Sequence, residues 1–75
     1  MMDKKIKECL KQIFPKKKFK VLKKLGLGSF KEWDSLAHLN FMLIIEKKFK
    51  IKFTMNQMYE VKKITEIKKI INSKK

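Results

Sequence analysis

Apolar residues recur at helical spacing along this chain, most clearly in its central segment. Directly after Asp34, a short acceptor side chain suited to a helix N-cap, they fall on two arcs at about 100° per residue. One arc holds Phe41, Met42, Ile44, Ile45 and Phe49, and a roughly opposite arc holds Leu36, Leu39 and Leu43. A surface helix needs only one apolar arc. The pattern therefore predicts a helix over residues 35–49 that packs a core with one face and offers the other to a partner.

Three shorter segments predict helices around this one. Residues 2–14 carry an apolar arc and stop at Pro15, because the residue before a proline disfavours the α region. Thr54 and Gln57 have the spacing of a capping box, which predicts a short helix over residues 55–59. Thr65 is the expected cap of a last helix. The arcs of the first and last helices hold Ile6, Cys9, Leu10, Ile13 and Phe14, and Ile67, Ile70 and Ile71.

The connection over residues 15–33 is long for a loop, so apolar side chains should anchor it. The expected anchors are Phe19, Val21, Leu22, Leu25, Leu27, Phe30 and Trp33. Gly26 and Gly28 are expected in turns and lack the spacing of a phosphate-binding loop. Ser29 and Glu32 match a capping box that would start a short turn. Ile51 and Phe53 alternate with lysines, which suggests a short extended segment. The elements together predict an all-α fold, a small four-helix bundle.

Length and composition indicate one small domain, residues 1–75, with an apolar fraction of 44% that is ordinary for a folded protein. We find no apolar run long enough to span a membrane and no secretory signal, so we expect a cytoplasmic monomer. The lone cysteine, Cys9, is interpreted as a core residue, and no metal-ligand cluster is visible. His38 is interpreted as a packed, hydrogen-bonded residue because no nucleophile partner is recognisable.

The net charge is +14, from 21 basic and 7 acidic residues, and every basic residue is lysine. Such a charge attracts polyanions, so one hypothesis is a basic helical module that binds nucleic acid or anionic membrane surfaces. The lysines are spread over all segments, which argues against sequence-specific binding of nucleic acid. The lysine bias is also compatible with codon usage in an AT-rich genome.

A stretch of the central helix resembles a known family. From Trp33 the chain reads Trp-Asp-Ser-Leu-Ala-His-Leu-Asn, then an apolar run, Glu-Lys-Lys-Phe and Ile-Lys-Phe. This order resembles the acyl carrier protein family over roughly residues 25–71. The resemblance implies a four-helix bundle of acyl-carrier type, with a long loop between the first two helices and a short third helix. It also implies that Ser35, flanked by Asp34 and Leu36, carries a covalent 4′-phosphopantetheine arm.

The position of Ser35 suits such an arm, because free backbone N–H groups at a helix start favour phosphate. Asp34 and Ser35 would equally serve as an ordinary helix start. The resemblance implies a non-catalytic carrier that holds acyl or aminoacyl groups as thioesters. Its partners would be a phosphopantetheinyl transferase and acyl-transferring or acyl-modifying enzymes.

The resemblance also places two surfaces. The recognition face would lie on the central helix and include Leu36, Leu39, Asn40, Leu43 and Lys47. The acyl chain would shelter between helices, against some of Phe41, Ile45, Phe53, Met58 and Ile64.

Two features depart from the family. Typical members are strongly acidic and present carboxylates on this helix, whereas here it carries Glu46, Asn40 and Lys47. Trp-Asp-Ser-Leu also replaces the more usual Gly-x-Asp-Ser-Leu. The sequence therefore predicts a carrier in a specialised lipid, polyketide or glycan-modification pathway rather than in general fatty acid biosynthesis. Its enzymes would have less basic or acidic docking surfaces.

Overall fold

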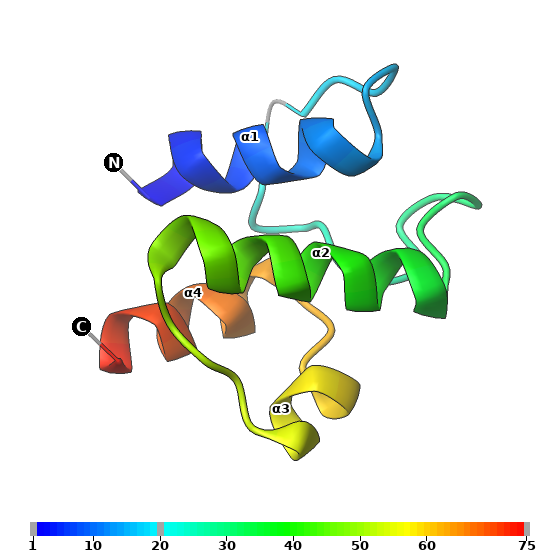
Figure 1. The fold of residues 1–75 in the computed structure, drawn as a ribbon. Helices are drawn as coiled ribbons and strands as arrows, with labels where there is room; N and C mark the ends of the chain where they lie inside the picture. Colours follow the sequence, from blue (N-terminus) through cyan, green and yellow to red (C-terminus); the bar gives the residue numbers. More distant parts are fainter. Residues whose placement is uncertain (1, 20, 75) are drawn as a thin grey trace.

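The fold is an all-α bundle in a computed structural model that describes residues 2–19 and 21–74. Within them the chain forms four helices and no strand: α1 (Met2–Ile13), α2 (Ser35–Phe49), α3 (Met55–Glu60) and α4 (Ile64–Ser73). α1 lies along α2 and runs in the opposite direction, with α4 on the far side and the short α3 at one edge (Figure 1). The predicted small bundle, with a long first loop and a short third helix, is confirmed. No helix among the described residues is long and apolar enough to cross a membrane.

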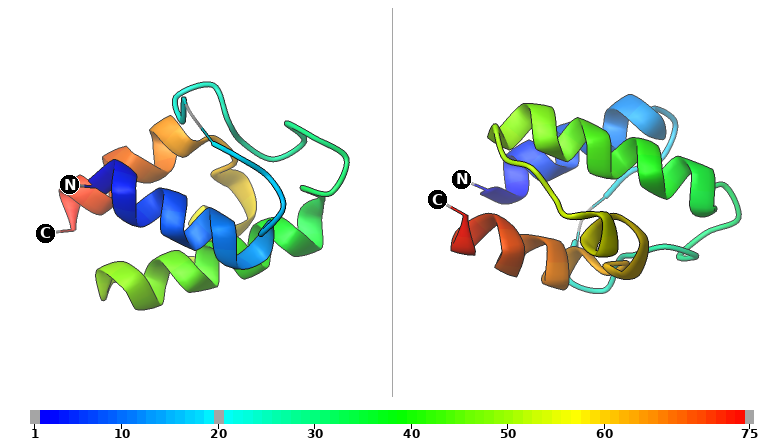
Figure 2. Two further views of the ribbon diagram at one scale, coloured as in Figure 1. Left: turned by 90° about the horizontal axis from the view of Figure 1, so that it is seen from above. Right: turned by 60° about the horizontal axis from the view of Figure 1, so that its bottom comes forward.

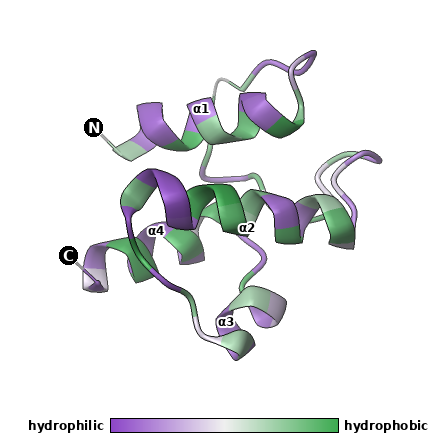
Figure 3. Cartoon of the chain, viewed as in Figure 1, coloured by the Kyte–Doolittle hydropathy of each residue, from purple (hydrophilic) through white to green (hydrophobic). Residues whose placement is uncertain are grey.

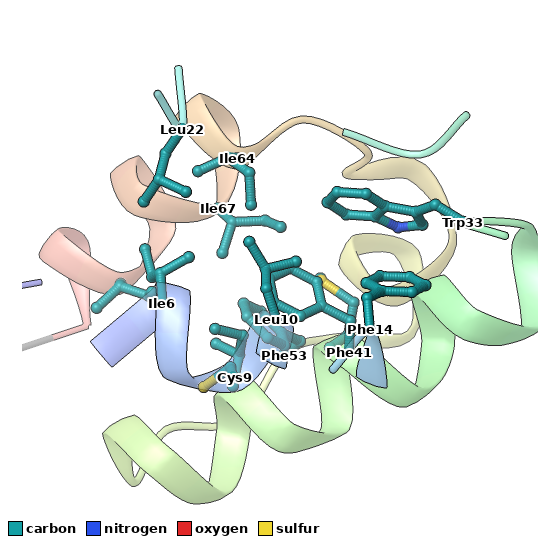
Figure 4. Close-up of a cluster of buried hydrophobic side chains, with 13 residues drawn as sticks. Ile6, Cys9, Leu10, Phe14, Leu22, Trp33, Phe41, Phe53, Ile64 and Ile67 are labelled. Carbon is teal, nitrogen blue, oxygen red and sulfur yellow. The ribbon is translucent and has the colours of Figure 1, made fainter. Parts of the chain in front are cut away.

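The core lies between α1, α2 and α4 and is closed by the long loop (Figure 4). The side of α1 that faces α2 is apolar and its outer side is polar (Figure 3), as the arc of Ile6, Cys9 and Leu10 predicts. The buried apolar residues are Ile6, Cys9, Leu10, Phe14, Leu22, Trp33, Phe41, Met42, Ile45, Phe53, Ile64, Ile67 and Ile71. The core arc predicted for the central helix is confirmed, with Ile44 and Phe49 packed at its edge.

α2 has the predicted bounds because local signals fix both of its ends. Asp34 is extended (φ −92°, ψ −174°) and its Oδ1 accepts a hydrogen bond from the Ala37 N–H at 2.9 Å. At the other end Lys50 adopts the left-handed conformation (φ 57°, ψ 46°), and its N–H and that of Ile51 both donate to the Glu46 carbonyl. The Ile51 bond is the 6→1 bond of a Schellman motif, and the Lys50 bond is the 5→1 bond of a left-handed helix cap.

The long loop is anchored, as predicted. Leu22 and Trp33 are buried, and the rings of Phe14 and Phe30 meet edge to face at 4.8 Å between centroids. The anchoring prediction is wrong for Val21, which is 55% exposed because the neighbouring Leu22 occupies the buried position.

The same loop pairs with the linker between α3 and α4, and Figure 2 shows the cyan segment of the loop beside the start of α4. Gly26 and Lys63 form an isolated antiparallel bridge, and the Leu27 N–H donates to the Lys62 carbonyl at 2.9 Å. A Cβ on Gly26 would lie 2.6 Å from that Lys62 oxygen. Gly26 is therefore required by the close approach of two backbones.

Two predicted caps are wrong. α4 begins at Ile64, one residue before Thr65, and the Ile64 N–H donates to the Leu25 carbonyl at 3.0 Å. The helix has no side-chain cap, because the side chain of its N-cap residue, Lys63, carries no acceptor. Ser29 forms no capping box with Glu32, since its Oγ accepts from the Gly26 N–H at 2.8 Å.

The observed ends of α1 and α3 each differ from the predicted ends by one residue. α1 ends at Ile13, before Phe14, and α3 continues to Glu60. The capping box of Thr54 and Gln57 is confirmed in both of its hydrogen bonds. The segment around Ile51 and Phe53 forms no strand.

Candidate functional site

Ser35 is the first residue of α2 and is exposed. Asp34 holds the helix start through its side chain, and its carbonyl accepts the first helical hydrogen bond, from the His38 N–H at 2.9 Å. An exposed hydroxyl beside a fixed helix start is accessible to a large enzyme and lies at the positive end of the helix dipole. Leu36, the next residue, is 69% exposed.

A chain of two hydrogen bonds, here called the relay, links Trp33, His38 and Val61 beneath this helix start. The Trp33 indole N–H donates to His38 Nδ1 at 3.0 Å, and His38 Nε2 lies 2.7 Å from the Val61 carbonyl. Because an indole N–H can only donate, Nδ1 must be unprotonated and Nε2–H must donate to Val61. The relay thus joins the residue before the cap, the first turn of α2 and the end of α3.

His38 is buried, 3% exposed, and both of its ring nitrogens are engaged. Burial is the main cause that lowers its pKa, the Val61 hydrogen bond opposes this, and nearby Lys62 adds to the lowering. A proton on His38 Nδ1 would also clash with the indole N–H of Trp33, since both groups would then be donors. The prediction of a packed, hydrogen-bonded histidine is confirmed, and its geometry leaves no free nitrogen for a catalytic base.

Aromatic rings pack around the relay. Trp33 lies 5.6 Å from Phe14 and 5.5 Å from Phe41 between ring centroids, and its side chain is 1% exposed. These contacts draw together α1, the long loop and α2. The start of α2 is therefore packed against the end of α1 and the long loop, and Ser35 lies exposed beside these contacts.

The residues expected on the recognition face lie on the side of α2 that turns away from the core. Leu36, Asn40, Leu43 and Lys47 are exposed and Leu39 is half-buried. Beside them an open apolar groove of about 370 Å³ runs between α2 and α3. It is lined by Leu39, Leu43, Phe53, Met55, Met58 and Tyr59.

The residues expected to shelter an acyl chain divide into two groups. Phe41, Ile45 and Ile64 are fully buried in the core. Phe53 and Met58 line the groove between α2 and α3. The structure therefore brings only two of the five to a surface that a ligand reaches without repacking of the core.

Cys9 is fully buried, and burial raises the pKa of its thiol to about 11. A thiol of this kind is protonated at neutral pH and inert. The prediction of a core cysteine is confirmed. No group of three or more histidine, cysteine or acidic residues among the described residues is placed to hold a metal ion.

Comparison of the chain with protein-family models, with curated proteins and with solved structures gave no match.

Sequence reasoning missed the bond between Trp33 and His38. The two occupy the positions just before the cap and at the fourth residue of the helix, where a hydrophobic staple places its contacting pair. That spacing was the available signal, although it does not reveal that the contact is a hydrogen bond.

Proposed function

We propose that this protein is a carrier of acyl or aminoacyl groups, bound as thioesters to a 4′-phosphopantetheine arm on Ser35. The observation that carries the proposal is the placement of Ser35, exposed at the capped start of α2 and next to the exposed Leu36. The resemblance of the Asp-Ser-Leu stretch to acyl carrier proteins supplies the identity of the arm.

Attachment of the arm requires only an accessible serine hydroxyl from this protein. A phosphopantetheinyl transferase joins the Ser35 Oγ to the pantetheine-bearing phosphate of coenzyme A. The phosphodiester forms, the hydroxyl proton is lost and adenosine bisphosphate leaves. The chain contributes an accessible hydroxyl and a helix start that favours the attached phosphate. It performs no catalysis, and transfer of the acyl group belongs to its partner enzymes.

The surface beside Ser35 supports a specialised pathway. Its exposed residues on α2 are apolar, neutral or basic, namely Leu36, Asn40, Leu43 and Lys47. Enzymes that recognise acidic carriers through basic patches would meet Lys47 here. We therefore infer partners with neutral or acidic docking surfaces, in a lipid, polyketide or glycan-modification pathway.

The proposal is tested by intact mass. The protein is incubated with coenzyme A and a broad-specificity phosphopantetheinyl transferase. We expect a gain of one phosphopantetheine in the wild type and in Ser29→Ala, a matched control for an exposed serine outside a helix start, and none in Ser35→Ala. A circular dichroism spectrum of Ser35→Ala shows whether the variant folds. No gain in the wild type, repeated with the transferase of its own source organism, would overturn the proposal.

The partner inference has its own test. Lys47→Glu restores an acidic side chain on the recognition face, and Lys47 is preferable to Lys48 because Lys48 pairs with Glu8 of α1 at 2.8 Å. We expect Lys47→Glu to improve transfer by enzymes that serve acidic carriers. A wild-type protein that already serves them well, with no response to the substitution, would contradict the inference.

The basic binding module remains the competing function, favoured by the charge of +14. Ionic strength separates the two, because binding to polyanions falls steeply with salt whereas a covalent arm does not.

A further inference from the structure

A second groove, of about 650 Å³, lies at the end of α2 that is remote from Ser35. It adjoins the recognition face, since Leu43 and Lys47 belong to both. Leu43 and Ile51 supply its apolar lining. The other lining residues are Glu46, Lys47, Lys50 and Lys52.

The groove is lined by three lysines. The side chains of Lys47, Lys50 and Lys52 are exposed, and none of the three pairs with a carboxylate among the described residues. The one carboxylate in the lining, on Glu46, is tied to the backbone, because its Oε2 accepts from the Phe53 N–H at 2.8 Å. Three positive groups therefore face a single negative one that is already hydrogen-bonded.

Lys50 occupies a position that favours glycine. It is the only non-glycine residue with positive φ among those that the structure describes, at φ 57°. Helices that end in this conformation usually have Gly, sometimes Asn, at this point. A lysine here is more strained than glycine and leaves its ammonium group unpaired. The lysine at this strained position therefore adds an unpaired positive charge to the groove, which an anionic partner would neutralise.

We propose that this groove docks an acidic amphipathic helix of a protein partner. Carboxylates of the partner would pair with Lys47, Lys50 and Lys52, while an apolar side chain between them packs on Leu43 and Ile51. The proposal deepens the proposed carrier function, because it places the partner's acidic surface on the same helix as Ser35.

The lining favours a protein over the other anionic surfaces that lysines attract. Single-stranded nucleic acid is held by stacking on aromatic rings or on Arg guanidinium groups, and the lining residues include neither. A planar anionic membrane also attracts lysines, but it has no ridge that fills the hollow lined by Leu43 and Ile51. An amphipathic helix presents a ridge of apolar side chains between charged flanks, which matches a hollow with a basic rim.

The test uses a synthetic amphipathic peptide of about 14 residues, roughly four helical turns, with leucines on one face and glutamates beside them. The ¹⁵N-labelled full chain is titrated with this peptide and followed by NMR. We expect the largest shifts at the amides of Leu43, Lys47, Lys50, Ile51 and Lys52, and affinity that falls with salt. A peptide in which glutamine replaces every glutamate should bind at least about 10-fold more weakly.

Two variants of equal net charge show whether peptide affinity depends on the groove lysines or only on the net charge of the protein. Lys47→Gln, Lys50→Gly and Lys52→Gln are combined in the first, and Lys23→Gln, Lys31→Gln and Lys69→Gln, all exposed and outside the groove, in the second. Both lower the net charge from +14 to +11, by three lysines. We expect about a 10-fold loss of affinity in the first and less than about 2-fold in the second.

The single variant Lys50→Gly controls for the possibility that the triple variant loses affinity because it misfolds. It relieves the left-handed backbone and removes one charge, so we expect its melting temperature to rise by about 2–5 °C while affinity falls about 3-fold. Equal losses in the two triple variants, or unchanged affinity in Lys50→Gly, would overturn the proposal.

Two further measurements complete the test. Tighter binding of vesicles containing phosphatidylglycerol, or of oligothymidylate, through the same amides would also overturn the proposal. Intact mass of the wild-type protein after arm transfer, set beside its peptide titration, keeps the two hypotheses apart. Arm attachment without peptide binding would leave the carrier function and remove the groove, and peptide binding without attachment would do the reverse.

Discussion

At the scale of single residues, His38 gives the clearest case of chemistry set by packing. Its neutral ring is fixed by a donor on one side and an acceptor on the other, and burial lowers its pKa from the ordinary value of 6.5. The unfolded chain therefore binds a proton more readily than the folded one. Stability from this residue is complete above about pH 6.5 and is lost as the pH falls from there toward the folded pKa.

This sign makes a prediction. The free energy of unfolding, measured by urea titration with Trp33 fluorescence, should decrease between pH 7 and pH 5 with a slope of at most about 1.4 kcal/mol per pH unit. His38→Gln has no group that titrates in this range, so its stability should be nearly independent of pH there. An equal slope in both proteins would show that another group is responsible.

Gly26 makes a second prediction at the residue scale. A methyl group at this position would overlap the Lys62 carbonyl and force apart the loop and the linker. We expect Gly26→Ala to lower the free energy of unfolding by about 2 kcal/mol or more, as strained core substitutions do. The measurement is urea denaturation followed by circular dichroism.

Gly28 offers the matched control, since it has φ +87° but no atom near the added Cβ. Gly28→Ala should cost about 1 kcal/mol from backbone strain alone, and Gly28→Asn less, because Asn tolerates this region. If Gly26→Ala were no worse than Gly28→Ala, the close approach of the two backbones would not be the reason for glycine at position 26.

At the scale of elements, α2 shows how local signals determine a helix. Asp34 accepts from the Ala37 N–H, and removal of such a cap typically costs about 1 kcal/mol. Asp34→Ala should therefore lower the melting temperature by about 4–8 °C, whereas Asp34→Ser, which keeps an acceptor, should lower it much less. Thermal denaturation by circular dichroism measures both. Equal losses would mean that the charge of Asp34, rather than its cap, stabilises the helix.

The helices differ in how far sequence predicts them, and the difference follows from where their hydrogen bonds go. The start of α2 and the capping box of α3 depend on side chains three residues away, which a reader of the sequence can see. The start of α4 depends on the Leu25 carbonyl, far away in sequence, so the cap expected at Thr65 was misplaced. Ser29 was misassigned although its partner is only three residues away, because its Oγ accepts from the Gly26 N–H in the loop and not from a helix N–H.

The candidate site divides in the same way. The exposed Ser35 and the outward leucines follow from periodicity and from the resemblance of one short stretch. The relay that fixes the helix start ends on the Val61 carbonyl, a backbone atom that no sequence pattern marks. The division of the expected acyl-chain residues between core and groove depends on tertiary packing, which periodicity leaves open.

At the scale of the whole molecule, most acidic side chains make contacts within the chain, whereas most lysines do not pair with a carboxylate among the described residues. Five of the seven acidic side chains have intramolecular roles. Asp3, Glu8 and Glu32 pair with Lys68, Lys48 and Lys17, Asp34 caps α2, and Glu46 binds the Phe53 N–H. Most acidic side chains therefore form ion pairs or hydrogen bonds within the chain, and the excess of lysines gives a net repulsion.

This imbalance predicts how the protein responds to salt. Exposed ion pairs such as that of Glu8 and Lys48 contribute little, and salt weakens them slightly, whereas repulsion among a net charge of +14 acts on the whole compact state. Sodium chloride shortens the screening length from roughly 20–30 Å near 0.02 M to about 6 Å near 0.3 M, which suppresses the repulsion. We therefore expect the melting temperature to rise by several degrees over this range. The combined Lys23, Lys31 and Lys69 variant, with a net charge of +11, should show a higher melting temperature at low salt and a smaller rise. A melting temperature that falls with salt would mean that the three ion pairs outweigh the repulsion, and the lysines would then have to be placed far more favourably than their exposure indicates.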